Sequence, residues 1–536
     1  MSSSVSISEV KPLVRVNPWI IAAAVVVPTF MEVLDTTIAN VALRYIAGGL
    51  SASVNDSEWV ITSYLAANAT ILPISGWLSA YLGRRRYFLL SIAVFTIASG
   101  LCGMATSIEQ LIAFRVLQGL AGGGLQPSSQ GVLIDAFPRE KQSAAMTLFA
   151  IAGLIAPVIG PTLGGYLTVF YNWRWIFYIN LPIGVLGCVA CAMVLEDPDY
   201  LKEQRARMLS RPLNFDYIGL GLLALAVSCW EILLSKGQEW DWLNDPFLWV
   251  HALVLLFVLS LGALFVWEMK ATNPVLNFRP LANRNFAVCS VIVFCVYGVL
   301  YGASTSLPGL LQTLFGYDAY VSGLVLSPSG IGSVVMLLIA GTLLTKGVDA
   351  RWLICTGLVV MVIGNYSMSQ MNLQVSPWHI IWPRVVTFAG ISLIFAPVTV
   401  AAFMYIPQEM RGAAVGLFAL LRNEGGSVGT SLAKTIVERR DQFHTARLGE
   451  FLDPLNPAVA KFSEETTHAF LQSTGDAVLS QQMTWQVLAD LRRQQAVSLS
   501  YFDAFWIFAV VSAALILLIP LMRRSVAEKG AHIAAE

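Results

Sequence analysis

Long apolar stretches recur along this chain, and short polar joints separate them. A helix needs about 20 apolar residues to cross roughly 30 Å of hydrocarbon, and many of these stretches reach that length. They are apolar on every side, as in residues 19–27 and 250–258, and lack the period-two alternation of membrane β-strands. The pattern predicts an all-α polytopic membrane protein with about fourteen spans, at residues 19–43, 57–80, 87–106, 110–132, 144–168, 174–195, 216–236, 247–268, 285–307, 320–345, 351–370, 380–405, 411–436 and 502–522.

Basic residues gather in alternate joints, which predicts the orientation of the chain. With the N-terminus in the cytoplasm, the short cytoplasmic joints carry many Lys and Arg residues, including Arg84, Arg85 and Arg86, and the opposite joints carry almost none. Cytoplasmic joints of membrane proteins have this excess. We therefore expect an even number of spans and both termini in the cytoplasm.

The spans form two groups of six. Residues 19–195 are expected to make an N-terminal six-helix half, and residues 285–523 a C-terminal half, with tails at 1–18 and 524–536. Residues 196–284 then hold cytoplasmic joints and two extra linker helices. A faint repeat relates Gly76 and Arg86 to Gly341 and Arg351. Repeated halves commonly build a transport site at the bilayer midplane.

Residues 439–500 form one long polar segment, which the predicted orientation places outside. Pro454 and Pro457 interrupt its helix-compatible sequence. We expect a solvated loop, and a hairpin that docks a partner is the alternative.

Composition agrees with a membrane setting. Of the 536 residues, 56% are hydrophobic and 12% are charged, and the mean hydropathy is +0.67. Soluble proteins carry about 25% charged residues, so a soluble globular protein is excluded. The formal net charge of zero gives no reason to expect nucleic acid as a partner.

Several chemical motifs are absent from the sequence. There is no Gly-Lys dipeptide and hence no phosphate loop, and the five histidines have no metal-ligand spacing. The seven cysteines lie in apolar runs and are odd in number, so no disulfide framework is expected. The first apolar run continues without a small-residue cleavage site, so no cleaved signal peptide is expected either. We expect no metal, no cofactor and no enzymatic activity.

Four polar residues share one face of the first span: Glu32, Asp35, Thr36 and Asn40. An acidic residue at the centre of a spanning helix costs about 3 kcal/mol, so embedded carboxylates indicate function. The alternative is that Glu32 or Asp35 lies near the outer interface and is solvated there.

Arg115 puts a permanent cation inside the fourth span, and Gln118 follows it beside a run of glycines. Such a cation requires a partner. One hypothesis is that Arg115 changes the proton affinity of a carboxylate such as Asp35 as a cavity opens and closes. The other is a static buried ion pair.

The second half offers further candidates. Arg422, Asn423 and Glu424 are consecutive in the thirteenth span, and residues two apart on a helix point in different directions, so Arg422 and Glu424 are expected to have separate partners. Glu231 is another embedded carboxylate, for which a structural role is favoured. An aromatic and amide surface suited to greasy or cationic compounds, or to ordinary packing, comes from Phe294, Tyr297, Tyr301 and Gln312.

The fifth span is unusually rich in residues that weaken helices: Gly153, Pro157, Gly160, Pro161, Gly164 and Gly165. Small residues permit close helix packing, and prolines permit bending. A gating role and a packing role are both compatible with this pattern.

Five segments fall in the order and spacing of one family's motifs. With them, the sequence resembles the fourteen-helix drug:proton antiporters of the major facilitator superfamily, the group that contains the EmrB multidrug exporters. The segments are LDTTIANVAL (Leu34 to Leu43), GWLSAYLGRRR (Gly76 to Arg86), RVLQGLAGGG (Arg115 to Gly124), APVIGPTLGG (Ala156 to Gly165) and NWRWIFYINLPIG (Asn172 to Gly184).

The resemblance implies roles for particular residues. It implies proton coupling for Asp35 and Arg115, to which we add Glu32 and Glu424 as candidates. For the conformational change it implies Gly76, Gly83, Arg84 and Arg85 in the loop motif, and Pro157, Gly160, Pro161, Gly164 and Gly165 in the fifth span. Candidate cavity residues are Asn40, Gln118, Tyr297, Tyr301, Gln312 and Asn423.

Three departures from the family pattern qualify these roles. Ala80 stands where many members have Asp, so the charge lock of that loop is in doubt. Arg44 replaces a usual proline, and Glu424 a usual apolar residue. The last change suggests a specialised substrate or an additional titrating site.

The expected function is proton-coupled export of small amphipathic or toxic compounds, driven by the proton gradient, at a bacterial inner membrane. The expected partners are the substrate, protons, the lipid bilayer and a periplasmic membrane-fusion adaptor. Alternatives are a narrow-substrate exporter and a membrane subunit or sensor that works with an adaptor. The fifth-span pattern argues against an importer.

Overall fold

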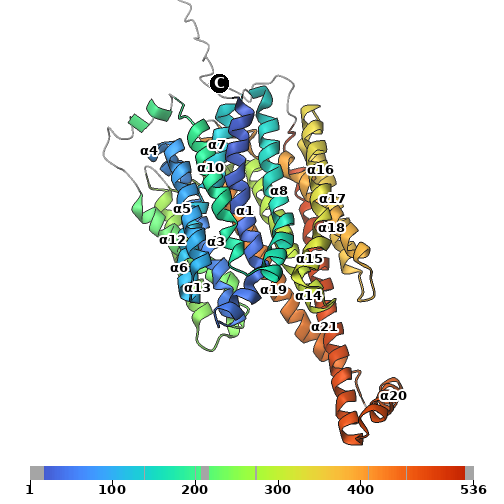
Figure 1. The fold of residues 1–536 in the computed structure, drawn as a ribbon. Helices are drawn as coiled ribbons and strands as arrows, with labels where there is room; N and C mark the ends of the chain where they lie inside the picture. Colours follow the sequence, from blue (N-terminus) through green and yellow to red (C-terminus); the bar gives the residue numbers. More distant parts are fainter. Residues whose placement is uncertain are drawn as a thin grey trace, which may run out of the picture.

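A computed structural model describes residues 17–137, 139–198, 201–203, 205–206, 216–271, 275–407, 410–453 and 455–525. Within these ranges the regular structure is helical (Figure 1). The helices of the first half and the linker are α1 (Pro18–Gly49), α2 (Val54–Ser57), α3 (Trp59–Ile71), α4 (Ser75–Leu82), α5 (Arg84–Met104), α6 (Ile108–Gly122), α7 (Leu125–Ala136), α8 (Arg139–Phe170), α9 (Trp175–Tyr178), α10 (Asn180–Val194), α12 (Tyr217–Lys236) and α13 (Trp249–Glu268). The later helices are α14 (Arg284–Thr313), α15 (Ala319–Leu326), α16 (Pro328–Thr345), α17 (Ala350–Ser369), α18 (Pro377–Phe403), α19 (Arg411–Gly449), α20 (Pro457–Thr474) and α21 (Ala477–Ile516).

A helix or a pair of helices lies at each predicted span. By length and composition, 11 described segments qualify as membrane-crossing helices. Two of the remaining spans are interrupted, because Pro73 separates α3 from α4, and Gly123 and Gly124 separate α6 from α7. The last is α19, whose charged residues lower its hydropathy. The predicted all-α membrane fold is confirmed, and the tails at 1–16 and 526–536 lie outside the described residues.

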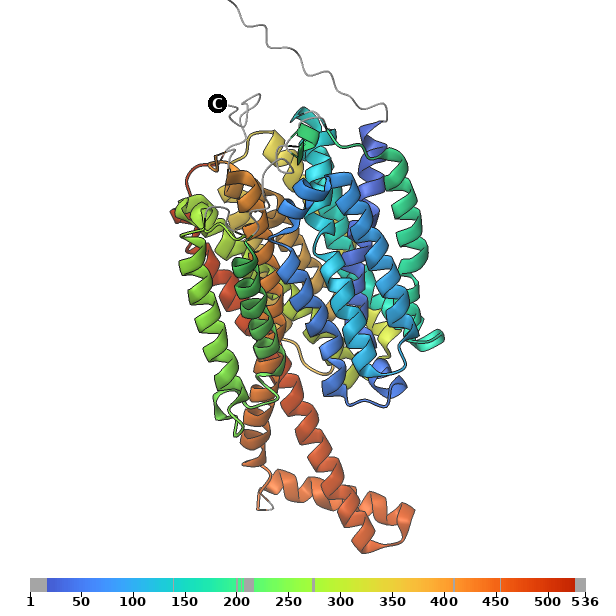
Figure 2. The ribbon, with the colours of Figure 1, turned by 90° about the vertical axis from the view of Figure 1, so that its left-hand side faces the viewer.

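The helices pack as two groups side by side. In the first group α1 packs on α8 and α10, and α3 on α6; in the second α14 packs on α19, and α17 on α18 and α21. The linker helices α12 and α13 pack on each other, and α12 also contacts α3 and α19 (Figure 2). Much of α13 is exposed, with Leu255 and Leu259 about 60% accessible. Since these side chains are apolar, they face lipid.

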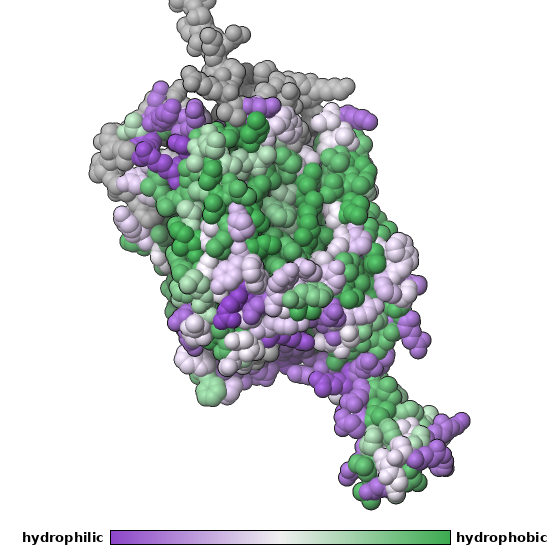
Figure 3. All heavy atoms as spheres, in the orientation of Figure 1, coloured by the Kyte–Doolittle hydropathy of each residue, from purple (hydrophilic) through white to green (hydrophobic). Residues whose placement is uncertain are grey.

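The surface agrees with a bilayer setting. Hydrophobic residues cover a broad band of the visible face of the bundle, and hydrophilic ones gather toward its lower end and at its upper left (Figure 3). Ile97, Leu186 and Met193 are among the exposed apolar side chains. The chain is therefore a multi-pass membrane protein.

The two groups touch on both sides of the molecule's centre. On one side, a Cβ added to Gly416 of α19 would lie 3.7 Å from the Cα of Pro73. On the other side, Lys434 Nζ donates to Glu58 Oε1 at 2.5 Å. The two groups also meet where α8 packs on α15 and α16. There the hydroxyls of Thr162 and Ser327 are 2.8 Å apart.

The segment 439–500 is not the solvated loop that the sequence favoured. Helix α19 continues to Gly449, α20 follows, and α21 begins at Ala477, so a helical hairpin projects beyond the bundle (Figures 1 and 2). At 1.5 Å per residue, the 39 residues of α19 span about 58 Å, well beyond the hydrocarbon thickness. A helix pairs its own backbone N–H and C=O groups, so it can continue into water beyond the membrane. The polar sequence of residues 439–500 therefore does not have to form a loop, even with prolines in it.

The loop after α4 is held to neighbouring helices by its arginines. Gly83 has φ +90°, a left-handed conformation that glycine adopts without strain. Arg84 forms an ion pair with Asp135 of α7 and donates to Gly131 O, and Arg85 donates its backbone N–H to Asp197 Oδ1 at 2.8 Å. An interhelical charge lock therefore exists without an acid at Ala80.

Candidate functional site

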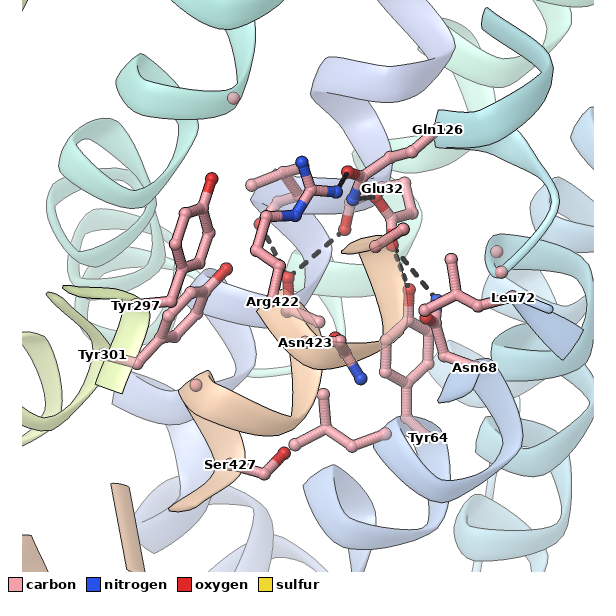
Figure 4. A pocket seen from close by; sticks show the side chains of 18 of the residues that line it. Glu32, Tyr64, Asn68, Leu72, Gln126, Tyr297, Tyr301, Arg422, Asn423 and Ser427 are labelled. Atoms are coloured by element: carbon pink, nitrogen blue, oxygen red, sulfur yellow. Dashed lines mark hydrogen bonds between the residues drawn. The ribbon is translucent and has the colours of Figure 1, made fainter. Parts of the chain in front are cut away.

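A cavity lies between the two groups of helices, near the middle of the bundle. It encloses about 1070 Å³, part of it open to solvent, and its walls come from α1, α3, α7, α8, α14, α18 and α19. Figure 4 shows polar side chains from both halves pointing into it. Its labelled lining residues are Glu32, Tyr64, Asn68, Leu72, Gln126, Tyr297, Tyr301, Arg422, Asn423 and Ser427.

Glu32 is the acidic group of this cavity. Its Oε1 accepts from Tyr64 Oη at 3.3 Å and Asn68 Nδ2 at 3.2 Å, and its Oε2 accepts from Gln126 Nε2 at 2.8 Å. The side-chain carbonyl of Gln126 in turn accepts from Arg422 Nη2 at 2.5 Å. Gln126 therefore bridges a carboxylate of the first half to a guanidinium of the second half (Figure 4).

Aromatic rings form the wall of the cavity beside Arg422. Tyr297 and Tyr301 stack with ring centres 6.2 Å apart, and Phe395 lies 6.4 Å from Tyr297. The guanidinium carbon of Arg422 is 5.5 Å from the centre of the Tyr297 ring. Such a wall offers flat apolar area and a π-face to a bound molecule.

Asp35 and Arg115 meet in a second cluster, which is fully buried beside the cavity. Arg115 Nη1 donates to Asp35 Oδ2 at 2.5 Å, and Asp35 Oδ1 accepts from Gln118 Nε2 at 2.9 Å and Asn180 Nδ2 at 2.7 Å. Asp35 is 1% exposed and Arg115 is not exposed at all. The partner that Arg115 requires is thus Asp35, as the sequence predicted.

Tyr64 connects the two clusters. Its hydroxyl donates to Glu32, while the guanidinium carbon of Arg115 lies 4.3 Å from the centre of its ring. Contacts therefore run from Asp35 through Arg115 and Tyr64 to Glu32, which lines the cavity.

The predicted cavity residues divide into two sets. Asn40, Tyr297, Tyr301 and Asn423 line the cavity. Gln118 does not, because its amide is used by Asp35 and Arg115. Gln312 does not either, because it lies near the C-terminal end of α14.

Arg422 and Glu424 have separate surroundings, as their spacing predicted. Arg422 faces the cavity. Glu424 is 8% exposed and does not line the cavity, and it interacts electrostatically with Glu231 of the linker helix α12. Glu231 is 2% exposed.

Sequence reasoning missed four polar partners: Tyr64, Asn68, Gln126 and Asn180. Each is a polar residue within or beside an apolar run, which is a usable signal, but neutral side chains are common in such helices. Their partners lie 32 to 145 residues away in the sequence, so nothing local identifies them.

The glycines of the fifth span form a contact surface. A Cβ on Gly160 would lie 2.3 Å from Thr37 Oγ1, and a Cβ on Gly164 would lie 2.8 Å from Ile38 Cγ1. Both contacts are on α1, within three residues of Asp35. The helix that carries Asp35 is thus packed directly on α8, whose interior also contains Pro157 and Pro161.

Among the described residues, no three His, Cys, Asp or Glu side chains gather in a way that could hold a metal ion.

Comparisons with known proteins agree on one family. Residues 26–430 match the model of the Major Facilitator Superfamily. The multidrug export protein EmrB of Escherichia coli K12 is 34% identical over 505 residues, covering 93% of this chain and 94% of that protein. EmrB of Haemophilus influenzae is 36% identical over 472 residues, covering 87% and 90%. The crystal structure of the human organic anion transporter MFSD10 (TETRAN) has a TM-score of 0.57 at 12% identity, covering 94% of this chain and 100% of that one.

Two helical groups around a central polar cavity define a membrane transporter of small molecules. The chain belongs to the major facilitator superfamily, in its EmrB-like branch of multidrug exporters.

Proposed function

We propose that this protein exports small amphipathic compounds by proton-coupled antiport, with alternating access to the central cavity. The observation that carries the proposal is the pair of clusters joined by Tyr64: a cavity with Glu32, Arg422 and an aromatic wall, next to the buried Asp35–Arg115 pair. The relatives named multidrug export proteins support the same function.

In this mechanism the cavity binds substrate and the buried pair binds the proton. A substrate enters from the cytoplasm or the inner leaflet and lies against Tyr297 and Tyr301, with Glu32 or Arg422 available to a charged group. A proton from outside adds to the Asp35 carboxylate, which becomes neutral and loses its ion pair with Arg115. Arg115 then moves relative to Tyr64, which weakens the set of donors that holds Glu32 and favours substrate release.

The proton gradient is sufficient for this task. One proton is worth about 2.3 kcal/mol per 100 mV and about 1.4 kcal/mol per pH unit, or roughly 3.7 kcal/mol together. At about 1.4 kcal/mol per tenfold, it supports a substrate gradient of several hundredfold. The mechanism needs no metal, cofactor or ATP. We propose that it operates in a bacterial inner membrane, with both termini of the protein in the cytoplasm.

The test is dissipation of a pH gradient in energised inverted vesicles by a panel of lipophilic cations, anions and neutral drugs. We expect at least one compound to discharge the gradient with the wild type and not with Asp35→Asn. If no compound does so while the protein is folded, multidrug antiport is wrong. A narrow-substrate exporter then takes its place.

A second candidate role, as the membrane subunit of a complex with a periplasmic adaptor, is favoured by the helical hairpin. The hairpin extends far from the bundle and exposes apolar side chains, among them Phe451, Leu455 and Val478 at 58%, 87% and 68%. An adaptor that co-purifies with the wild type and not after deletion of residues 441–500 would support this role. The matched variant, with Phe451, Leu455 and Val478 changed to Ser, keeps the hairpin and tests its apolar surface alone.

A further inference from the structure

Two buried carboxylates lie behind the cavity wall, and the central mechanism uses neither of them. Glu231 comes from the linker helix α12 and Glu424 from α19. They are 2% and 8% exposed. Among the described residues, neither carboxyl oxygen of Glu424 accepts a hydrogen bond, and Oε1 of Glu231 accepts none.

The two carboxyl groups are close enough to interact electrostatically. Trp230 lies beside Glu424, and Ser427, one turn along α19, lies beside Glu231. The same two helices are joined further along by a hydrogen bond from Ser431 Oγ to Leu234 O at 2.5 Å. Both carboxyls therefore lie where α12 and α19 contact each other.

No cation lies against this pair among the charged groups of the neighbouring elements. Each cation has its own partner: Lys236 pairs with Glu239, Lys434 with Glu58, and Arg422 donates to Gln126. The acid Glu268, at the end of α13, accepts from Leu276 N. Tyr297 and Tyr301 of α14 lie at the cavity. Two adjacent buried carboxylates without a cation cannot both be ionised.

We propose that Glu231 and Glu424 form a second proton site, which holds one proton between the two carboxyl groups. The proposal rests on the proposed antiport function and deepens it. The proton keeps one of the two carboxyls neutral, and it leaves when α19 moves relative to α12. Because Ser427 lines the cavity and also lies beside Glu231, occupancy of the cavity is coupled to this site.

The first test detects the proton itself and needs no transport. Infrared spectra of the purified protein in lipid nanodiscs are recorded across a pH titration, and the C=O stretch of protonated carboxyl groups is followed. We expect a carboxyl band in the wild type that is lost from the double variant Glu231→Gln/Glu424→Gln and kept in Glu465→Gln, a control on the exposed hairpin. Superimposable titrations of the wild type and the double variant would overturn the proposal.

The second test counts protons. From the reversal potential of reconstituted transport, we expect two protons per substrate in the wild type and one in the double variant. An unchanged proton count with a large loss of affinity for lipophilic cations would overturn the proposal and make the pair a cation-binding site. If the double variant does not fold, Glu424→Asp replaces it in the infrared test. This substitution shortens one side chain by a methylene group, and we expect it to shift the carboxyl band.

The two proposals fail in different ways. If no compound is transported at all, the antiport function is wrong, but the infrared band still reports whether this pair binds a proton. If transport is coupled and the band is unchanged by the substitutions, only the second site is wrong.

Discussion

At the scale of single residues, the Asp35–Arg115 pair is isolated from solvent. Asp35 accepts three donors, whereas Arg115 Nη2 is buried without a partner among the described residues. A buried ion pair gives little net stability, because desolvation offsets the attraction between the charges. Stability alone therefore does not explain its presence, whereas the proposed proton coupling would require it.

The pair should behave as a unit in unfolding experiments. We expect Arg115→Gln to lower the free energy of unfolding by about 3–5 kcal/mol, because Asp35 then stays buried without its cation. The double variant Asp35→Asn/Arg115→Gln removes both charges and should recover most of that loss. Thermal unfolding of the purified protein in one detergent measures both.

The comparison of the two variants is the control. If the double variant is as unstable as Arg115→Gln, the loss comes from the packing of Arg115 against the rings of Tyr64 and Phe177, and the charge argument is wrong.

Sequence reasoning identified this pair and missed its neighbours for a physical reason. A charge within an apolar helix is conspicuous because of its cost, and two opposite charges imply each other. Gln118 and Asn40 also lie on polar helix faces, but periodicity does not say what a face meets. Gln118 contacts Asp35, whereas Asn40 lines the cavity. The Gln126–Arg422 contact joins residues 296 apart and has no local sequence signal.

At the scale of elements, the first and fifth helices of each half pack through glycines. In the first half, Gly160 and Gly164 of α8 lie against α1. In the second half, α14 and α19 approach more closely, since a Cβ on Gly429 would lie 2.0 Å from Gly298 O. Small residues that let backbones approach hold membrane helices together where lipid provides no hydrophobic drive. The glycines of the fifth span thus have at least the packing role.

Alanine substitutions at these glycines should differ in severity. We expect Gly429→Ala to destabilise the protein most, because backbone atoms of Gly298 stand in its way. Gly160→Ala should cost less, about 1–3 kcal/mol, because the nearest atom is the Thr37 hydroxyl, which can rotate, and α1 must shift only to relieve the Thr37 Cβ at 2.9 Å. The measurement is the thermal unfolding temperature of three single variants: Gly429→Ala, Gly160→Ala and Gly153→Ala.

Gly153→Ala is the matched control on α8, because a Cβ there would meet nothing within 4 Å. It should be neutral or stabilising by up to about 1 kcal/mol, as expected for Gly to Ala in a helix. Equal losses at all three positions would mean that helix propensity or insertion, and not close packing, decides the outcome.

The elements themselves were largely predictable, with two informative exceptions. Hydropathy located the spans because the membrane imposes one length on all of them. It did not show the breaks at Pro73 and at Gly123–Gly124, which leave the apolar run intact. It also did not show the hairpin, since helices outside the bilayer have no required length or hydropathy.

At the scale of the whole molecule, the halves are in contact on both sides of the cavity. Pro73 and Gly416 meet on one side, and Glu58 and Lys434 on the other. Alternating access requires that one of these contacts separates in each open state. A covalent link across either one should therefore stop the cycle.

A disulfide between residues 73 and 416 tests this directly. The Cβ of a cysteine at 416 would lie 3.7 Å from the Cα of residue 73, so the two backbones are close together. In a background with the seven native cysteines replaced, oxidation of Pro73→Cys/Gly416→Cys should abolish transport, and a reductant should restore it. The single variant Pro73→Cys should transport equally under both conditions. If the oxidised pair is shown to be cross-linked and still transports at the full rate, this contact does not open during transport, and the cavity must be reached by another route.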